Sequence, residues 1–253
     1  MPPTSDRKPS AGPRPSTALV PRIRTDPGLQ TLVTDIPDSW PPQESETPLG
    51  GRALTAPLFP LPGAFLFPRQ LMALHVFEPR YRQMVEDILD GAGRIVIGTV
   101  PVDQQEKMRD LASPPEVLPI AGLGEIARHE RLPDGRFAVW LFGLGRVAIE
   151  EAPSERLYRQ VRCAPLVEVE PTPAEARTLE EPLRGAVQER HPELLNLPDD
   201  VPTSMLVDLL CQRLPLEQPD MEAIFAEPDV ARRAELALAG HATAGPPPED
   251  EED

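Results

Sequence analysis

The spacing of apolar positions divides this chain into a strand-rich middle and a helical end. Between residues 57 and 170, apolar residues recur at every second position or in short continuous runs, which is typical of strands. The run LMALHVF (71–77) alternates, and RIVIGTV (94–100) has the composition of a buried strand. Two further alternating runs flank Pro133–Gly135, which predicts a hairpin turn with glycine at a positive φ.

Prolines and glycines refine this strand pattern. The apolar runs PLFPL (57–61) and AFLFP (64–68) are broken by prolines, which favours barrel edges or bulges over central strands. Gly143 and Gly145 interrupt the strand that follows the hairpin, as glycines do where a strand bends at a barrel corner. The segment RLYRQVRCAPLVEVE (156–170) predicts a further long strand, whereas the polar stretch from 102 to 116 predicts a loop.

One helix is expected within the strand region, between residues 79 and 91. Pro79 stands at the first helical position and Gly91 suits the C-terminal cap. The apolar positions between them recur at three-to-four spacing: Tyr81, Met84, Val85 and Ile88. About six strands with this inserted helix predict an α+β fold built on a small, closed or partly closed β-barrel.

After Pro171 the period changes to that of helices. Thr172 is expected as an N-cap with Pro173 at the first helical position, and Pro182 is expected to kink or divide that helix. The next helix presents an apolar face: Met205, Leu206, Leu209, Leu210 and Leu214. Two more short helices end near Gly240, so the barrel is followed by a compact helical subdomain.

The two ends of the chain lack periodicity. The first residues are dense in proline and serine, with Trp40 and the short LQTLV as their only apolar anchors, and the chain ends in a polar acidic run. We therefore expect four regions: a disordered proline-rich leader at 1–54, a β-barrel domain at 55–171, a helical extension at 172–240 and an acidic disordered tail at 241–253.

Charge and lysine usage narrow the classes of function. A net charge of −16 at pH 7 opposes binding to nucleic acid or anionic membranes, because phosphate contacts need clustered basic residues. The only lysines, Lys8 and Lys107, follow no P-loop glycine run and lie in polar surroundings that offer no desolvation. No apolar run approaches the roughly 20 residues of a membrane helix. The composition favours a cytoplasmic protein without a cofactor.

Cysteines and histidines offer little for catalysis or metal binding. Cys163 and Cys211 form no CxxC motif and have no neighbouring histidine, which favours two reduced, mostly buried thiols over a disulfide. The four histidines have no acids or thiols at metal-ligand spacing: His75, His129, His191 and His241. With no GxSxG motif present, we expect neither catalytic residues nor a metal site.

The middle of the chain resembles the Lon protease N-terminal domain family, also called the Lon substrate-binding domain. FPLP (59–62), LFP (66–68) and LHVFEPRYR (74–82) match the opening of that family almost residue by residue. GLGEIARHERLPDGRFAVWLFGLGRVAI is similar to a later element, and the match covers about 58–239. Arg69 departs from the glycine usual after LFP, so the turn there is expected to differ. Trp140 and Phe142 stand where smaller aliphatic residues are common, which would enlarge an apolar face.

The resemblance implies a PUA-like barrel with a helical extension and a role in binding polypeptide. In the full protease this domain is followed by an ATPase module and a Ser–Lys peptidase domain, and the lysines here match neither motif. The chain is therefore similar to stand-alone Lon-domain proteins. We expect a non-enzymatic module that recognises unfolded or hydrophobic polypeptide in quality control or proteolysis, in association with a protease or chaperone. An ATP-independent hydrolase, a PUA-like RNA binder and weak self-association stay open as alternatives.

Two sets of residues are candidates for roles in this region. The polypeptide-binding candidates are Phe59, Phe65, Phe67, His75, Trp140 and Phe142. Either some of them line an apolar surface that holds a client, or all of them are core; the period-two rule places Trp140 and Phe142 on one strand face. The structural candidates at the strand–helix junction are Phe77, Glu78, Pro79, Arg80 and Tyr81. There, Glu78 favours the helix dipole, Arg80 pairs with Glu78 or with a strand-end carbonyl, and Tyr81 packs the helix on the barrel.

Overall fold

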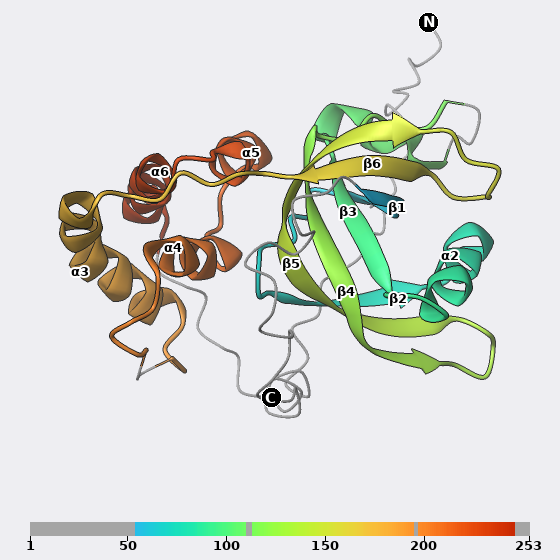
Figure 1. The fold of residues 1–253 in the computed structure, drawn as a ribbon, viewed down its shortest axis with the longest axis horizontal. Helices are drawn as coiled ribbons and strands as arrows, with labels where there is room; N and C mark the ends of the chain where they lie inside the picture. The colour runs from blue at the N-terminus through green and yellow to red at the C-terminus, as the bar shows by residue number, and fades with distance from the viewer. Residues whose placement is uncertain (1–53, 110–112, 195–196, 246–253) are drawn as a thin grey trace, which may run out of the picture.

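The computed structural model describes residues 54–109, 113–194 and 197–245. Within them lies a β-barrel with a group of helices on one side and a single helix at the opposite end (Figure 1). The strands are β1 (Leu54–Pro62), β2 (Leu71–Val76), β3 (Arg94–Val100), β4 (Ile120–Arg131), β5 (Phe137–Ala152) and β6 (Gln160–Pro165). The helices are α2 (Pro79–Leu89), the 3₁₀ helix η1 (Val102–Arg109), α3 (Pro173–Arg190), α4 (Thr203–Gln212), α5 (Gln218–Ala226) and α6 (Val230–Thr243). The predicted leader up to residue 53, with Trp40, lies outside the described residues, as do residues 246–253 of the predicted tail.

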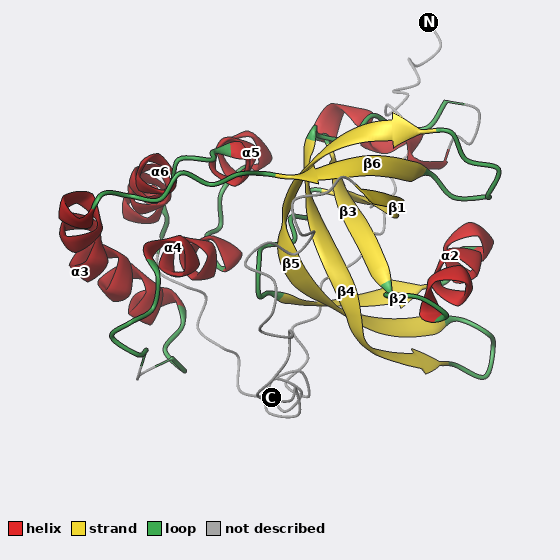
Figure 2. Ribbon diagram, viewed as in Figure 1, coloured by secondary structure: helices red, strands yellow, loops and turns green. Residues whose placement is uncertain are grey.

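The described strands form one sheet in the order β2-β5-β4-β3-β1-β6, and β6 also pairs with β5. The second half of the long strand β5 pairs with β6, which closes a ring of β1, β3, β4, β5 and β6. The first half of β5 pairs instead with β2, from Leu71↔Phe142 to Val76↔Phe137. Figure 2 shows how the strands and the helices α3–α6 occupy separate parts of the molecule. The predicted α+β fold, a barrel with an inserted helix and a helical extension, is confirmed.

The proline-containing strand β1 lies inside the sheet, so its predicted place at a barrel edge was wrong. Leu58 donates its backbone N–H to Arg159, the residue before β6, whereas Gly63 donates to Val100 of β3, so the backbone groups of even-numbered residues of β1 face β6 and those of odd-numbered residues face β3. Pairing with β3 begins only after Pro57, and pairing with β6 ends at that residue. The nitrogens of Pro57, Pro60 and Pro62 therefore all fall where no ladder partner exists, which removes the usual cost of proline in a strand.

The run AFLFP, predicted as a strand, is an irregular segment that crosses β4 and β5. Glycines make this crossing possible. A Cβ added at Gly122 would overlap the backbone of Leu66, and one added at Gly143 would overlap the carbonyl of Phe67. The predicted bend also occurs here, because the β4–β5 register shifts at Leu123/Gly124, opposite Gly143 and Gly145.

The turn after this segment keeps a conformation that favours glycine, although arginine occupies it. Arg69 has φ 61°, in the left-handed region. Its N–H donates to the carbonyl oxygen of Gly143 (2.7 Å), and the N–H of Gly143 donates in turn to Gln70 (2.8 Å). These two hydrogen bonds hold the arginine in a backbone conformation that costs about 1–2 kcal/mol for a residue with a Cβ. The turn that we expected to differ at Arg69 therefore has the backbone conformation that favours glycine. What differs is the presence of a side chain and the backbone strain that it brings.

The helical extension begins as predicted. Thr172 caps α3, and its side chain and that of Glu175 form a reciprocal capping box, with Pro173 at the first position. Pro182 does not divide this helix, which runs unbroken to Arg190. Pro182 and the residue one turn before it, Thr178, are both exposed, so the carbonyl that loses its donor faces solvent.

Several predicted boundaries were wrong by a few residues. Strand β6 ends at Pro165, and the following extended segment makes one isolated bridge, Val169↔Asp229. Part of the predicted loop after β3 forms the 3₁₀ helix η1, and the C-cap of α2 is Asp90, one residue before Gly91. Helix α6 runs to Thr243, past both Gly240 and the predicted start of the tail at 241. Its last turn is fixed because His241 accepts from Arg190 Nε (3.2 Å).

The buried residues form separate cores in the barrel and in the helices. Leu58, Leu123 and Val147 lie in the barrel, whereas Leu183, Leu206 and Leu210 lie among the helices. The two cysteines follow the same division, with Cys163 in the barrel and Cys211 among the helices. Both thiols are buried and neither forms a disulfide, as predicted, and that of Cys163 donates to the carbonyl oxygen of Leu54 (3.3 Å).

Candidate functional site

Two of the predicted polypeptide-binding residues are buried, which leaves no side-chain surface for a client. Phe59 packs against Tyr81 with ring centroids 4.4 Å apart and joins α2 to the barrel. Phe142 is also buried. These two residues are therefore part of the core, which is the alternative that we left open for them.

Phe65 and Phe67 hold the helices on the barrel. Their ring centroids lie 5.2 Å and 5.1 Å from that of Phe225 in α5, and Phe67 belongs to the helical core. Such aromatic pairs stabilise a contact by about 0.5–1.5 kcal/mol beyond the area that they bury. The two phenylalanines are therefore part of a barrel–helix seam, which corrects their expected place on an open surface.

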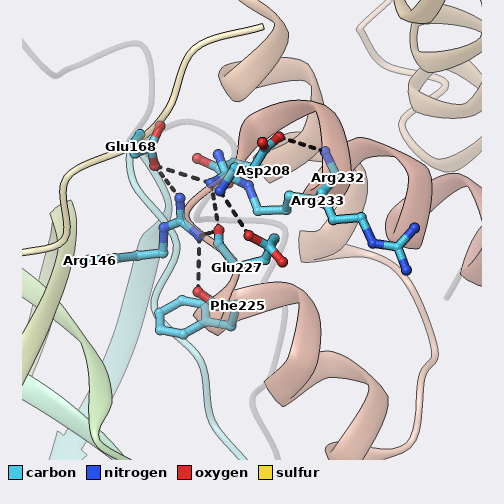
Figure 3. A network of polar contacts seen from close by, with 8 residues as sticks. Arg146, Glu168, Asp208, Phe225, Glu227, Arg232 and Arg233 are labelled. Carbon is cyan, nitrogen blue, oxygen red and sulfur yellow. Dashed lines mark hydrogen bonds and ion pairs between the residues drawn. The ribbon is translucent and has the colours of Figure 1, made fainter.

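A buried polar network completes this seam, and Figure 3 shows it from close by. Arg146 of β5 donates from Nη1 to the carbonyl oxygens of Phe225 (2.9 Å) and Glu227 (3.1 Å) and pairs through Nη2 with Glu168. Arg233 of α6 lies 3.3 Å from the same Glu168 carboxylate. One carboxylate of the segment after β6 thus binds an arginine of the barrel and an arginine of the helices.

A second carboxylate, Asp208 of α4, closes the network, with Oδ1 3.5 Å from Nη2 of Arg233. Both arginine side chains are almost wholly buried, at 1% exposure for Arg146 and 0% for Arg233. Burial raises the pKa of Asp208 to about 7, since the charged carboxylate loses hydration there, although the nearby charge of Arg146 acts in the opposite direction. The charges of the seam are paired within the protein, so its role is to fasten the helices to the barrel.

Sequence reasoning missed this network, although one signal existed. Arg146 is the arginine of the L-x-G-x-x-R-x-x-I element in LFGLGRVAI, the run that supported the family resemblance. An arginine that follows a barrel corner in an otherwise apolar strand is expected to have a buried partner. Asp208, within the apolar helix TSMLVDLLCQ, is a signal of the same kind.

The remaining candidates lie together on the outer side of β2 and β5. Ala73 pairs with Trp140 and His75 pairs with Ala138, which places all four side chains on one side of the sheet. His75 is exposed, and its ring lies 6.2 Å from that of Phe77, which is 60% exposed. We call this surface the β2–β5 face: Ala73, His75, Phe77, Ala138 and Trp140.

Trp140 is half-buried on this face beneath an arginine of β4. The guanidinium of Arg128 lies 5.1 Å from the centroid of the indole ring, at the distance of a cation–π contact. The indole Nε1 is shielded from solvent and has no hydrogen-bond partner among the described residues. Trp140 and Phe142 share a face in the register, as predicted, although Phe142 is buried more deeply.

The strand–helix junction is architectural except for its first residue. Pro79 occupies the first turn of α2, and Arg80 pairs with Glu78 at 2.9 Å. Arg80 also lies over the ring of Tyr81, and burial raises the pKa of Tyr81 to about 12. Phe77, which we grouped with this motif, instead projects outward. It follows β2 in the same alternation as His75, and this period-two signal was available in the sequence.

The histidines occupy separate places. His129 lies exposed on β4, His191 lies buried against the Leu209 carbonyl (2.8 Å), and His241 pairs with Glu189 (3.1 Å). Burial lowers the pKa of His191, because the imidazolium loses hydration. No group of three or more metal-ligating side chains exists among residues 54–109, 113–194 and 197–245. Among the same residues, no helix has the length and apolarity needed to cross a bilayer.

Comparison with known proteins identifies the family. The family model of the ATP-dependent protease La (Lon) substrate-binding domain matches residues 55–239, and the chain therefore belongs to the Lon substrate-binding domain family. This result confirms the resemblance seen in the sequence and ties the chain to a domain that is described by substrate binding in proteolysis.

Relatives and solved structures agree with this assignment. The chain is 25% identical to the Lon protease of Brevibacillus choshinensis over 193 residues. This alignment covers 72% of this chain and 24% of that protein. It is 20% identical over 186 residues to Lon protease 1 of Herpetosiphon aurantiacus, covering 70% of this chain and 23% of that protein. The chain thus spans about a quarter of the length of these relatives.

Two solved structures share the fold. One is a Lon N-terminal domain protein from Xanthomonas campestris, with a TM-score of 0.52 and 20% identity, covering 74% of this chain and 98% of that chain. The other is the N-terminal domain of the Lon protease from the Mycobacterium avium complex, with a TM-score of 0.58 and 16% identity, covering 75% and 99%. At these identities the likeness shows the fold.

Proposed function

We propose that this chain is a non-enzymatic, cytoplasmic module that binds unfolded or hydrophobic polypeptide in a proteolysis-related process through its β2–β5 face. The family is described by substrate binding, which supports a polypeptide client. The observation that carries the proposal is the exposure of Phe77 next to His75, on the side of the sheet that also carries Trp140, because exposed apolar side chains that gather on one surface mark interaction sites.

The face suits weak and sequence-tolerant binding. Covering one large apolar side chain contributes roughly 1.5–3 kcal/mol, so Phe77 with the open part of Trp140 supports modest affinity. A client that displaces Arg128 would gain access to the indole ring over which this guanidinium lies. Aromatic rings and short side chains on a pleated surface make few contacts that depend on the client sequence. Such a surface suits unfolded chains of varied sequence.

The proposal is tested by removing the exposed ring and comparing a matched change elsewhere. Phe77→Ser is expected to weaken binding of fluorescently labelled, unfolded casein about tenfold or more, as the loss of 1.5–3 kcal/mol requires. Leu157→Ser is the control, because Leu157 is 70% exposed on the loop before β6, away from this face. Binding is measured by fluorescence anisotropy without ATP, and the casein is afterwards examined on a gel.

Two results would contradict the proposal. Equal affinities for wild type, Phe77→Ser and Leu157→Ser would exclude the β2–β5 face as the binding surface. Cleavage of casein by the purified chain, lost on replacement of a single serine, would establish the hydrolase alternative in place of a binding module.

A further inference from the structure

Strand β2 is the edge of the described sheet. Each other described strand has at least two neighbours: β1 pairs with β3 and β6, β3 with β1 and β4, β4 with β3 and β5, and β6 with β1 and β5. Among the described strands, β2 pairs with β5 alone. Every described strand except β2 is thus paired on both sides, and β2 is the strand that carries His75 and leads to Phe77.

The register shows which backbone groups of β2 face outward. Gly143 of β5 donates its N–H to the carbonyl of Gln70, which makes this pair a hydrogen-bonded pair. Hydrogen-bonded and non-hydrogen-bonded pairs alternate along an antiparallel ladder. The even-numbered residues of β2 therefore bond to β5, and the N–H and C=O groups of Leu71, Ala73 and His75 point to the free edge. Outside the ladder, none of these three forms a backbone hydrogen bond within the described residues.

This edge lacks the usual protection against strand pairing. Natural edge strands are shielded by lysines, prolines, inward charges or bulges. The sequence LMALHV of β2 contains no proline and no Asp, Glu, Lys or Arg, and its pairing with β5 runs without a register shift. By contrast, the proline-rich strand β1 is paired on both sides. The open strand is the one best suited to accept a further strand.

We propose that the client binds by strand addition, as an extended segment that pairs its backbone with Leu71, Ala73 and His75. The segment is free of proline, because it must supply N–H groups, and apolar at alternate positions, because those side chains lie beside the β2–β5 face. Basic flanking residues are favoured by the net charge of −16. This inference rests on the proposed function and names the class of polypeptide that the same surface takes.

Proline scanning of β2 tests the mode of binding separately from the binding itself. Ala73→Pro removes an outward N–H, which a free edge tolerates, whereas Ala73→Thr keeps the N–H and changes only the side chain. The probe is a fluorescein-labelled peptide with two lysines at each end and alternating valine and threonine between them. Its affinity for the full-length chain is expected to fall at least tenfold with Ala73→Pro and to stay within about threefold with Ala73→Thr, measured by anisotropy at low and high salt. The attraction between the lysine ends of the peptide and the net charge of −16 predicts that affinity falls with salt.

A second measurement guards against a proline variant that fails to fold. The same peptide, N-methylated at its central residues, is expected to bind wild type at least tenfold more weakly than the parent peptide. Equal binding of the proline and threonine variants, or of the methylated and parent peptides, would overturn strand addition and leave the proposed function standing. Absence of binding to both this peptide and unfolded casein would remove the proposed function itself.

Amide exchange distinguishes the occupants of the edge. The N–H groups of Leu71, Ala73 and His75 are expected to exchange quickly in the free full-length chain and slowly once the peptide is added. Slow exchange before any addition, unchanged on dilution, would mean that another segment of this chain covers the edge. Slow exchange that is lost on dilution would mean pairing with a second copy. Either result would overturn the inference.

Discussion

The barrel–helix seam and the β2–β5 face both use aromatic residues from one stretch of sequence, and they use them in opposite ways. At the seam, Phe65 and Phe67 pack against Phe225, and the buried arginines Arg146 and Arg233 pair with a partly buried carboxylate, that of Glu168. On the face, His75 of β2 and Phe77 just after it are exposed, and β2 has only one neighbour among the described strands. The difference teaches that an unusual density of aromatic residues indicates contact surfaces, and that only burial reveals which contacts are already made.

The strongest way to break the seam is to remove Arg146. Arg146→Ala leaves Arg233 as the remaining arginine partner of both the Glu168 carboxylate and the Glu227 carbonyl, and it removes the donor to the Phe225 carbonyl. We expect a loss of about 3–5 kcal/mol in the free energy of unfolding, as for other broken buried ion pairs, measured by urea denaturation. The control is Arg162→Ala, which removes an exposed partner 3.8 Å from Glu150 and should cost less than about 0.5 kcal/mol.

The next largest effect on stability is expected where residues 64–68 cross β5 close to Gly143. Gly143→Ala places a methyl group against the backbone of Phe67 and should lower the free energy of unfolding by about 3 kcal/mol. Gly185→Ala is the matched control, because a Cβ at this position in α3 meets nothing within 4 Å. It should raise stability by about 0.5–1 kcal/mol through helix propensity. Similar losses for both variants would contradict the close crossing.

The stability contributed by the seam should also depend on pH. Burial raises the pKa of Asp208 from 3.8 in the unfolded chain to about 7 in the folded one, so the folded chain binds more protons between these values. This contribution to stability is complete below pH 3.8 and is lost as pH rises to about 7, at up to about 1.4 kcal/mol per pH unit.

Asp208→Asn provides the comparison, because it removes the titrating group and keeps a similar shape. Its free energy of unfolding should vary less steeply than that of wild type between pH 4 and pH 7, measured by urea denaturation at each pH. A wild type that instead gains stability relative to Asp208→Asn as pH rises would show that Arg146 and Arg233 outweigh burial at this site.

The smallest effect concerns the turn that connects seam and face. Arg69→Gly relieves a left-handed backbone at φ 61° and should stabilise the chain by up to about 1 kcal/mol, part of which is offset by the greater freedom of glycine when unfolded. Thermal unfolding measures this change. A loss of stability would mean that the arginine side chain contributes more than its backbone strain costs.

Much of the fold could be predicted from local sequence, because strand alternation, helix period and capping act over a few residues. Thr172 with Pro173 placed the start of α3, and Gly135 placed the hairpin turn with φ 80°. The crossing of residues 64–68 could not be predicted, because it depends on glycines more than fifty residues later.

The candidate site was predicted less well, because exposure depends on the tertiary neighbours of each ring. Phe67 and Phe77 have similar local surroundings, with a proline one or two residues later, yet one meets Phe225 and the other meets solvent. The partner at the seam lies more than 150 residues away in sequence. Only the alternation through His75 and Phe77 indicated the outward face in advance.

Photo-crosslinking is the most direct test of this division between an occupied seam and an open face. An unfolded client protein with benzophenone groups would be irradiated with the full-length chain, and the adducts would be mapped by mass spectrometry. We predict adducts at residues 71–77 and 138–140 that are lost when unlabelled client is added in excess. Adducts confined to α3–α6, with none on β2 or β5, would contradict the account.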